Sequence, residues 1–489
     1  MATVTAAKVR TEHDFLGDRE VPADAYYGVQ TLRGSENFPI TGLPIHPALI
    51  RAMGIVKKAA ALANRDTGHL DAKIANAIAQ AADDVIAGKL DQWFIVDPIQ
   101  GGAGTSINMN TNEVIANRAL ELLGHPKGTY TVVSPNSHVN MAQSTNDSFP
   151  TGIHIATLDL GKKLVAELEL LHQAFAKKEK EFAGIIKMGR THIQDAVPVR
   201  LGQEFGAYRR VIGRDIERIR NTGKTLVEVN MGATAVGTGL NADPDYIKAV
   251  VKHLAEFSGW PIVSAPDLVD ATQNTDAYTE VSAALKVCMM NLSKIANDLR
   301  LMASGPRCGL GELNLPARQP GSSIMPGKVN PVMAEVINQV AFQVIGNDTT
   351  VCLASEAGQF ELNVMEPVLA FNLLQSISIM TNAFRVFRTF CVEGLTANAE
   401  RMKAYVDNSV GVITAINPHV GYETAARIAR EANVSGKPVR ELILRDKVLT
   451  KEQLDAILDP FEMTKPGIAG AKQMKHDHVW KDTDEEKKH

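Results

Sequence analysis

Five short segments of the sequence are rich in side chains that could bind or activate a small polar molecule. They are made largely of glycine, hydroxyl and amide residues, with two histidines and one lysine and few bulky apolar side chains. Hydroxyls and amides bind by hydrogen bonds, and the few local charges could serve a small anionic substrate. These five segments, named the polar segments, are 101–113, 136–147, 189–195, 237–241 and 321–330.

A purely structural role is the alternative for any one polar segment taken alone. Glycine, serine, threonine and asparagine gather at helix caps and turns because they satisfy free backbone groups there. Asp147 and Ser134, for instance, could merely cap helices. That alternative weakens because five segments share one chemistry, and loops on a rigid scaffold are where binding and catalysis usually occur.

Familiar catalytic motifs do not account for these segments. The run Gly101–Gly104 lacks the glycine-lysine-serine ending of a phosphate-binding loop. His476 and His478 could bind a metal, but they lie in a charge-rich tail that we expect to be disordered. The sequence has no HExxH, CxxC or GxSxG pattern, so metalloprotease, redox and α/β-hydrolase functions have no support.

Long helices are expected to carry the polar segments. The first proline-free run spans 151–183, and its apolar residues repeat at steps of three and four, which indicates one buried helix face. Since a helix of ~30 residues is ~45 Å long, five such runs predict a mainly α fold with a central long-helix bundle. The other four runs are 199–229, 276–304, 331–346 and 367–390, and the repeating residues of the first are Leu160, Leu164, Leu168, Leu171 and Phe175.

A chain of 489 residues exceeds the ~250–300 at which a single core stops growing, so two or three domains are expected. The first forty residues are rich in glycine and proline and predict irregular structure with short strands at best. We expect an N-terminal mixed, mostly helical domain over 1–145, the bundle over 146–395, a small helical domain over 396–470, and a disordered tail over 471–489.

Composition excludes several classes of function. The 51 basic and 55 acidic side chains nearly cancel, so the basic excess of a nucleic-acid-binding protein is missing. No stretch approaches the ~20 apolar residues that span a membrane, and the first residues lack a signal-like apolar run. The four cysteines have no paired spacing, which fits a reducing compartment. We therefore expect a cytoplasmic protein that binds neither nucleic acid nor membrane.

The fifth polar segment carries a specific resemblance. Its sequence GSSIMPGKVN, with Pro331, matches the signature of the fumarase/aspartase superfamily over its whole length, and the other segments follow in that superfamily's order. The resemblance extends from about Asp14 to Gly470. Segments 101–113, 143–147 and 230–241 are similar to the aspartase branch, whereas class II fumarases typically have two serines where Ser144 and Thr145 stand.

That resemblance implies a three-domain, mainly α fold and a homotetramer whose active sites each combine segments of three subunits. It also implies the elimination of ammonia from L-aspartate to give fumarate, with no cofactor and no metal. A proton must leave the carbon next to the side-chain carboxylate, which then carries a second negative charge and must be met by preorganised donors. By resemblance Ser322 is the base, acting as an alkoxide stabilised by nearby backbone amides and Lys328, in a loop that closes over the substrate.

The resemblance assigns nine further residues to the substrate. Three would hold the side-chain carboxylate, three the α-carboxylate, and three would surround the departing amino group. These sets are, in the same order, Ser144, Thr145 and Ser323; Thr191, Lys328 and Asn330; and Thr105, Asn146 and His192.

Three alternatives remain open from the sequence. A class II fumarase would hydrate fumarate to malate, although Ser144 and Thr145 disfavour it. A structural protein that kept the fold and lost activity is the second, although intact Ser322, Lys328 and Asn330 argue against it. The third is a lyase for an analogue of aspartate.

Overall fold

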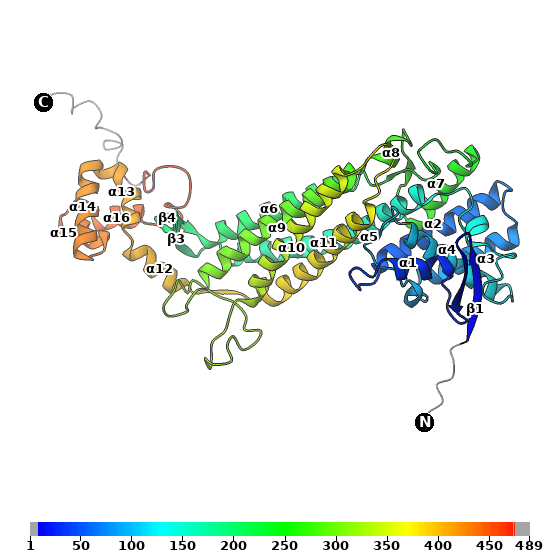
Figure 1. Cartoon of the computed structure of the whole chain (residues 1–489). Coiled ribbons are helices and arrows are strands. Elements are labelled where there is room, and N and C mark those ends of the chain that lie inside the picture. The colour runs from blue at the N-terminus through cyan, green and yellow to red at the C-terminus, as the bar shows by residue number, and fades with distance from the viewer. Residues whose placement is uncertain (1–7, 473, 475–489) are drawn as a thin grey trace. The chain divides into compact units, whose positions relative to one another are not determined.

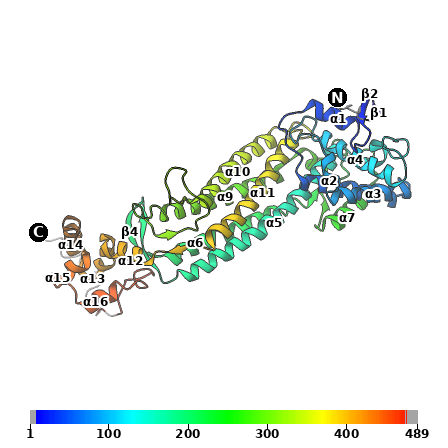
Figure 2. The same ribbon diagram turned by 90° about the horizontal axis from the view of Figure 1, so that it is seen from below.

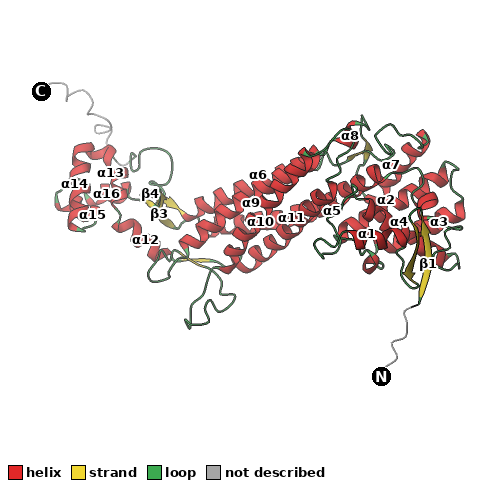
Figure 3. Ribbon diagram, in the orientation of Figure 1, coloured by secondary structure: helices red, strands yellow, loops and turns green. Residues whose placement is uncertain are grey.

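The computed structural model describes residues 8–472 and 474, and this part of the chain is mainly helical (Figures 1 and 3). Its strands form four two-stranded pairs and no larger sheet. The predicted mainly α fold is therefore confirmed. Most of the tail that was expected to be disordered, including the two histidines at 476 and 478, lies outside the described residues.

Contacts between residues divide the chain into two compact units. The first unit takes in the described residues up to Glu167, together with Asp215–Met290 and Val340–Asn382. The second takes in Leu168–Arg214, Asn291–Gln339 and the described residues from Ala383 onward. The division into three domains at 145/146 and 395/396 stays a prediction.

Five long helices correspond to the five predicted runs, and each contributes residues to both units. In the first run the five repeating apolar residues are all buried, from 0 to 9% exposed, as the spacing predicts. Figures 1 and 2 both show α9, α10 and α11 side by side. The five are α5 (Thr145–Glu181), α6 (Leu201–Thr222), α9 (Asp276–Met302), α10 (Val332–Glu356) and α11 (Glu366–Phe387).

Three predicted helix ends were wrong. The run expected to reach 229 ends at Thr222. The run expected to stop at Gly346 continues to Glu356, because one glycine costs only about 1 kcal/mol in a helix interior. The run expected to begin after Pro150 begins at Thr145, with the proline inside the helix.

Different side chains join the long helices in the two units. In the second unit, the ring of Phe182, which directly follows α5, meets the ring of Phe205 of α6 edge to face at 5.1 Å between centroids. In the first unit, the buried Asp348 of α10 accepts a hydrogen bond from Ser282 of α9 at 2.8 Å. The buried Asn347 of α10 donates to Ser376 of α11 at 2.9 Å.

The rest of the first unit is built from a hairpin and shorter helices. An antiparallel hairpin, β1 (Val9–Asp14) and β2 (Gly17–Pro22), opens the described chain. Six further α-helices and two short helices of other types belong to this unit, and β5 (Glu228–Val229) pairs with β6 (Val263–Ser264). The helices are α1 (Val29–Asn37), α2 (Pro47–Asp66), α3 (Ala72–Ile86), the 3₁₀ turn η1 (Asp91–Trp93), α4 (Thr105–Leu122), the π-helical turn η2 (Pro135–Val139), α7 (Pro244–Ser258) and the single turn α8 (Asp270–Gln273).

The second unit ends in a region of short helices. A hairpin of β3 (Ile186–Thr191) and β4 (Gln194–Arg200) and the pair β7 (Leu313–Asn314) and β8 (Thr396–Ala397) precede it. Its core is made of buried side chains such as Ile416, Ile428 and Leu442. The π-helical turn η3 (Arg388–Val392) follows α11, and the helices of this region are α12 (Ala399–Asn408), η4 (Val410–Val412), α13 (Ile413–Val420), α14 (Tyr422–Ser435), α15 (Val439–Arg445) and α16 (Lys451–Ile457).

None of the helices in the described part of the chain combines the length and the apolar character that crossing a bilayer requires.

Candidate functional site

Four predicted site residues lie at the starts of two helices in the first unit. Thr105 begins α4, while Ser144 directly precedes α5 and Thr145 and Asn146 are its first residues. One turn into α4, the buried Asn108 donates from its side-chain amide to Thr145 Oγ1 at 3.2 Å. The structure therefore brings these two parts of the predicted site together.

Asp147 connects the start of α5 to the stretch 230–241. Its buried carboxylate accepts from the backbone N–H of Ser144 at 3.0 Å, of Gly232 at 3.1 Å and of Thr234 at 3.0 Å. It thus caps a helix, as the structural alternative proposed, and it also fixes a second polar stretch beside Ser144. Burial raises the pKa of Asp147 to about 6, against the opposing effect of these hydrogen bonds and of Lys57.

Pro150 adds a second connection between the same two stretches. Proline has no N–H, so the carbonyl of Asn146, four residues earlier, loses its ordinary helical hydrogen bond. The side-chain amide of Asn230 donates to that carbonyl at 2.9 Å instead. The proline inside the helix therefore frees a group that holds the stretch beginning at Asn230.

Two hydroxyls at the start of α5 are arranged as hydrogen-bond donors. Ser144 Oγ accepts from the backbone N–H of Asn146 at 3.2 Å, and Thr145 Oγ1 accepts from Asn108. Within residues 8–472 and 474, no acceptor takes the proton of either hydroxyl. Both protons are therefore available to an anionic group such as a carboxylate.

Thr105 and Asn146 are arranged in the opposite sense. The Thr105 hydroxyl donates to the carbonyl of Gly102 at 2.7 Å, which leaves its oxygen free to accept. The Asn146 amide donates to the carbonyl of Ala235 at 2.7 Å, and its side-chain oxygen accepts no hydrogen bond from the described residues. These two oxygens suit an ammonium group, so the helix starts offer both polarities that an amino acid requires.

Lys57 of α2 is a functional candidate that the sequence did not predict. Its side chain is completely buried, and Nζ donates to Asn108 Oδ1 at 2.6 Å, Asn140 Oδ1 at 3.0 Å and Gln143 Oε1 at 2.9 Å. Burial lowers the pKa of Lys57 to about 7, and the charge of Asp147 opposes that shift. A sequence signal exists, because every neighbour at helical spacing is apolar or small: Met53, Gly54, Ala60 and Ala61.

Glu113, at the end of the first polar segment, has a structural role. From α4 its buried carboxylate accepts the backbone N–H groups of Gly28, Gln30 and Thr31 at 2.8, 2.9 and 3.0 Å. It thereby holds the first turn of α1. Burial raises the pKa of Glu113 to about 7, hydrogen bonds from Thr31 and Gln30 oppose the shift, and the nearby Glu12 adds to it.

This raised pKa predicts a pH-dependent difference between wild type and Glu113→Gln. An unfolded glutamate titrates near 4.5, whereas the folded chain keeps the Glu113 proton up to about 7. The stability from this group is therefore complete below pH 4.5 and is lost as pH rises through 7. Glutamine does not titrate, so the wild-type advantage in unfolding free energy should shrink by roughly 2 kcal/mol between pH 5 and pH 8.

Urea unfolding at pH 5, 6, 7 and 8 measures that difference. The matched control is Glu36→Gln, which changes a half-exposed carboxylate on α1 that is paired with Arg19. Its difference from wild type should stay within about 0.5 kcal/mol at every pH. A constant gap for the Glu113 variant across the series would contradict the raised pKa.

Thr191 and His192 lie at the tip of the hairpin of β3 and β4 in the second unit. Thr191 pairs with Gln194, so the turn consists of only His192 and Ile193. Both turn residues have positive φ, 56° and 61°, as the tightest hairpin turns require. That conformation is strained for a branched residue such as Ile193, and strained backbone often marks functional sites.

Ion pairs fix the base of this hairpin. The carboxylate of Glu312 is fully buried and contacts Arg190 Nη1 at 2.8 Å and Lys187 Nζ at 3.1 Å. Lys187 also contacts Glu204 of α6 at 3.0 Å. Because Arg190 precedes Thr191 in the chain, these pairs hold the strand that presents the tip.

Ser322 lies in the loop between β7 and α10, also in the second unit. Its Oγ accepts the backbone N–H of Ile324 at 3.2 Å and of Met325 at 3.0 Å. Two N–H donors aimed at one hydroxyl oxygen stabilise negative charge on that oxygen. The loop also encloses a depression of about 430 Å³ lined by Ser322 and Lys328.

The two ends of this loop are fastened to each other. The Gly321 N–H donates to the Lys328 carbonyl at 2.7 Å, and the Asn330 side-chain amide donates to the Gly321 carbonyl at 2.7 Å. A Cβ at position 321 would approach the Lys328 carbonyl oxygen to 2.7 Å, so the closure requires glycine there. Asn330 thus positions the Ser322 loop.

The predicted residues of the second unit are not joined to one another. No hydrogen bond among its described residues connects the hairpin tip to the Ser322 loop. The side chains of Thr191, His192, Ser323 and Lys328 are exposed, and Ile324 is 83% exposed. A serine that acts as a base needs a site closed to water, so a single chain shows these residues in an open arrangement.

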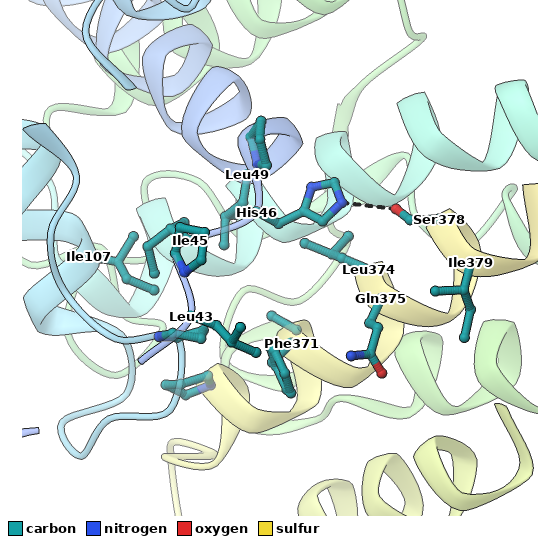
Figure 4. Close-up of a pocket in the computed structure, with 15 residues that line it drawn as sticks. Leu43, Ile45, His46, Leu49, Ile107, Phe371, Leu374, Gln375, Ser378 and Ile379 are labelled. Carbon is teal, nitrogen blue, oxygen red and sulfur yellow. Dashed lines mark hydrogen bonds between the residues drawn. The ribbon is translucent and has the colours of Figure 1, made fainter. Parts of the chain in front are cut away.

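A separate apolar pocket of about 260 Å³ lies in the first unit (Figure 4). It is lined by Leu43, Ile45, Phe371 and other apolar side chains, with His46 Nε2 and Ser378 Oγ 2.9 Å apart at its edge. None of the predicted site residues lines it.

The residues that the structure describes contain no group of three or more His, Cys, Asp or Glu side chains that could hold a metal ion.

Comparison with known families gives two matches along the chain. Residues 17–346 match the model of a lyase family, and residues 412–465 match the model of the fumarase C C-terminus. The chain is 70% identical to aspartate ammonia-lyase of Bacillus sp over 95% of this chain and 99% of the relative. It is 51% identical to aspartate ammonia-lyase of Escherichia coli (strain K12), over 94% of this chain and 96% of that one.

Solved structures show the same architecture. A fumarate lyase:delta crystallin from Brucella melitensis, determined with bound cobalt, superposes with a TM-score of 0.91 at 48% identity, covering 94% of this chain and 100% of that chain. A class II fumarase from Schistosoma mansoni superposes with a TM-score of 0.89 at 35% identity, with the same coverage.

Proposed function

Because this chain belongs to the lyase family and, within it, to the aspartate ammonia-lyases, we propose that it converts L-aspartate to fumarate and ammonia with Ser322 as the base. The enzyme is a carbon–nitrogen lyase. One structural observation favours an amino-acid dicarboxylate as substrate. The helix starts of the first unit offer free hydroxyl donors at Ser144 and Thr145 and free acceptor oxygens at Thr105 and Asn146.

In the proposed reaction, the Ser322 alkoxide takes a proton from the CH₂ carbon of L-aspartate and becomes a hydroxyl. The electron pair of that C–H bond moves into the side-chain carboxylate, which becomes an enediolate with a second negative charge. The pair then returns to form the C=C bond, and the C–N bond breaks to release ammonia. The N–H groups of Ile324 and Met325 support the alkoxide before the proton is taken.

The donors at Ser144 and Thr145, joined by Ser323, are proposed to meet the enediolate. No described residue accepts a hydrogen bond from the Ser144 or Thr145 hydroxyl, so little reorganisation is needed when the second charge develops. Thr191, Lys328 and Asn330 are proposed to hold the α-carboxylate, and His192 to stand with Thr105 and Asn146 around the amino group. The proposed chemistry uses side chains and backbone N–H groups of the protein, and we propose that it requires no cofactor or metal.

A homotetramer is part of the proposal. In one chain Thr191, His192, Ser323 and Lys328 are exposed, and no described hydrogen bond joins the hairpin tip to the Ser322 loop. An oxyanion site must exclude water to be effective. Active sites assembled from three subunits would supply that closure, and the exposed Ile324 would be buried as the loop closes. We also propose a cytoplasmic location.

The test is to mix the purified enzyme with L-aspartate and follow fumarate by its ultraviolet absorbance, with L-malate in parallel. Fumarate from aspartate alone is expected. Fumarate from malate alone would mean a fumarase, and silence with both substrates would point to an analogue-specific or inactive relative. Size-exclusion chromatography with light scattering measures the tetramer.

A further inference from the structure

The buried Lys57 contacts Asn108, and Asn108 in turn contacts Thr145 of the proposed carboxylate site. Lys57 contacts no carboxylate among its described hydrogen bonds, and all three acceptors of its ammonium are side-chain amide oxygens. Burying an ammonium is costly, and this arrangement satisfies its three protons with three neutral oxygens. Because the ammonium needs these three acceptors, it constrains the orientation of the amide side chains around it.

That constraint fixes the orientation of Asn108. An asparagine side chain can turn over and exchange its oxygen with its NH₂ group. At Asn108 the oxygen must face Lys57 Nζ, 2.6 Å away, because an NH₂ group there would oppose an ammonium. The NH₂ group of Asn108 is consequently directed to Thr145 Oγ1.

The orientation of Asn108 in turn decides what Thr145 can do. A hydroxyl that accepts from an amide keeps its own proton for another partner. If Asn108 turned over, its oxygen would take that proton, and Thr145 would offer a lone pair to a carboxylate. A lone pair facing a carboxylate is repulsive, and the repulsion grows as the second negative charge develops.

We infer that Lys57 is a positioning residue that, through Asn108, keeps the Thr145 hydroxyl a hydrogen-bond donor toward the substrate carboxylate. The inference rests on the proposed function, since it takes Thr145 as a carboxylate contact. Lys57 itself would not touch the substrate, and its effect would pass through its contact with Asn108 and the contact of Asn108 with Thr145.

A double-mutant cycle tests the inference. Lys57→Met and Thr145→Val are each expected to lower kcat/KM for L-aspartate by about 100-fold, mostly in kcat because the repulsion is greatest in the transition state. If Lys57 acts through Thr145, kcat/KM of the double variant should be at most about threefold lower than that of the less active single variant. Independent effects would multiply to about 10⁴-fold, and that result would overturn the inference.

Two further variants separate positioning from general damage. Lys57→Gln keeps an N–H donor for Asn108 and should regain about tenfold over the Met variant; no regain would contradict positioning by hydrogen bonding. Lys58→Met is the matched control. Lys58 follows Lys57 on α2 and is paired with the exposed Asp83 of α3, so this variant should stay within about twofold of wild type.

Circular dichroism and size-exclusion chromatography check that each variant is folded, and if Lys57→Met is not, the cycle is run with Lys57→Gln. Wild-type turnover of L-aspartate is measured first. If the wild type does not turn over L-aspartate, the proposed function is wrong. If it does, but the effects of the Lys57 and Thr145 variants multiply in the double variant, only the role of Lys57 is wrong.

Discussion

Replacing Ser322 with alanine is expected to lower kcat for L-aspartate by at least about 10³-fold while leaving the fold and the oligomer intact. The variant removes the oxygen that accepts two backbone N–H groups, and no nearby described side chain repeats that arrangement. The loop itself should persist, because its closure depends on Gly321, Lys328 and Asn330.

The measurement is steady-state kinetics with a binding assay beside it. Since Ser322 is proposed to act on a proton and not to bind a carboxylate, fumarate should still raise the melting temperature of the variant. The matched control is Ser435→Ala at the end of α14, where an exposed hydroxyl donates only to the Glu431 carbonyl. Turnover near the wild-type value in the Ser322 variant would remove this serine as the base.

Asp147→Asn carries the second large expected effect, on both stability and activity. The carboxylate accepts three backbone N–H groups, whereas an amide turns an NH₂ group toward at least one of them. A buried donor left without an acceptor costs about 1–3 kcal/mol, and the melting temperature should fall by several degrees. Because Ser144 loses a fixed neighbour, kcat/KM should fall by roughly 10²-fold.

Differential scanning fluorimetry and steady-state kinetics measure the two effects. Asp159→Asn is the matched control on the same helix, because asparagine keeps the oxygen that Trp260 Nε1 binds at 2.8 Å. That variant should resemble wild type in both assays. A lower melting temperature with unchanged kcat/KM for Asp147→Asn would show that the connection between the two stretches is structural only.

The long helices could be predicted because their signals are local and repeated. Leu164, Leu168 and Leu171 lie on one helical face, and all three are completely buried. Helix ends were less predictable, since a single glycine or proline is a weak signal that neighbouring contacts override. Gly346 lies inside α10, and Pro150 lies inside α5 because Asn230 replaces the missing hydrogen bond.

The hairpin of β3 and β4 could not be predicted from turn chemistry. Two-residue hairpin turns with positive φ favour asparagine and glycine, and this one has His192 and Ile193. Its support comes from Glu312, more than a hundred residues away in the sequence, and no local pattern carries that information.

In the candidate site, too, residues within a recognisable sequence segment could be predicted, and residues that depend on distant parts of the chain could not. Residues such as Ser322 stand out because their segment has a recognisable sequence, and their assigned roles stay predictions. Lys57 has no such segment, and its role depends on Asn108, Asn140 and Gln143 from two other parts of the chain. Only the folded arrangement shows that these residues meet.

Pro150 has a consequence for how the carbonyl of Asn146 is shared. With any other residue at position 150, that carbonyl would also accept the N–H of residue 150 in the ordinary helical pattern. Proline removes that donor, so the Asn230 amide does not share the oxygen with the N–H four residues later in the helix. A residue usually regarded as a helix breaker thus leaves a carbonyl open to a side chain from another part of the chain, one turn away from the hydroxyls that are proposed to meet the developing charge.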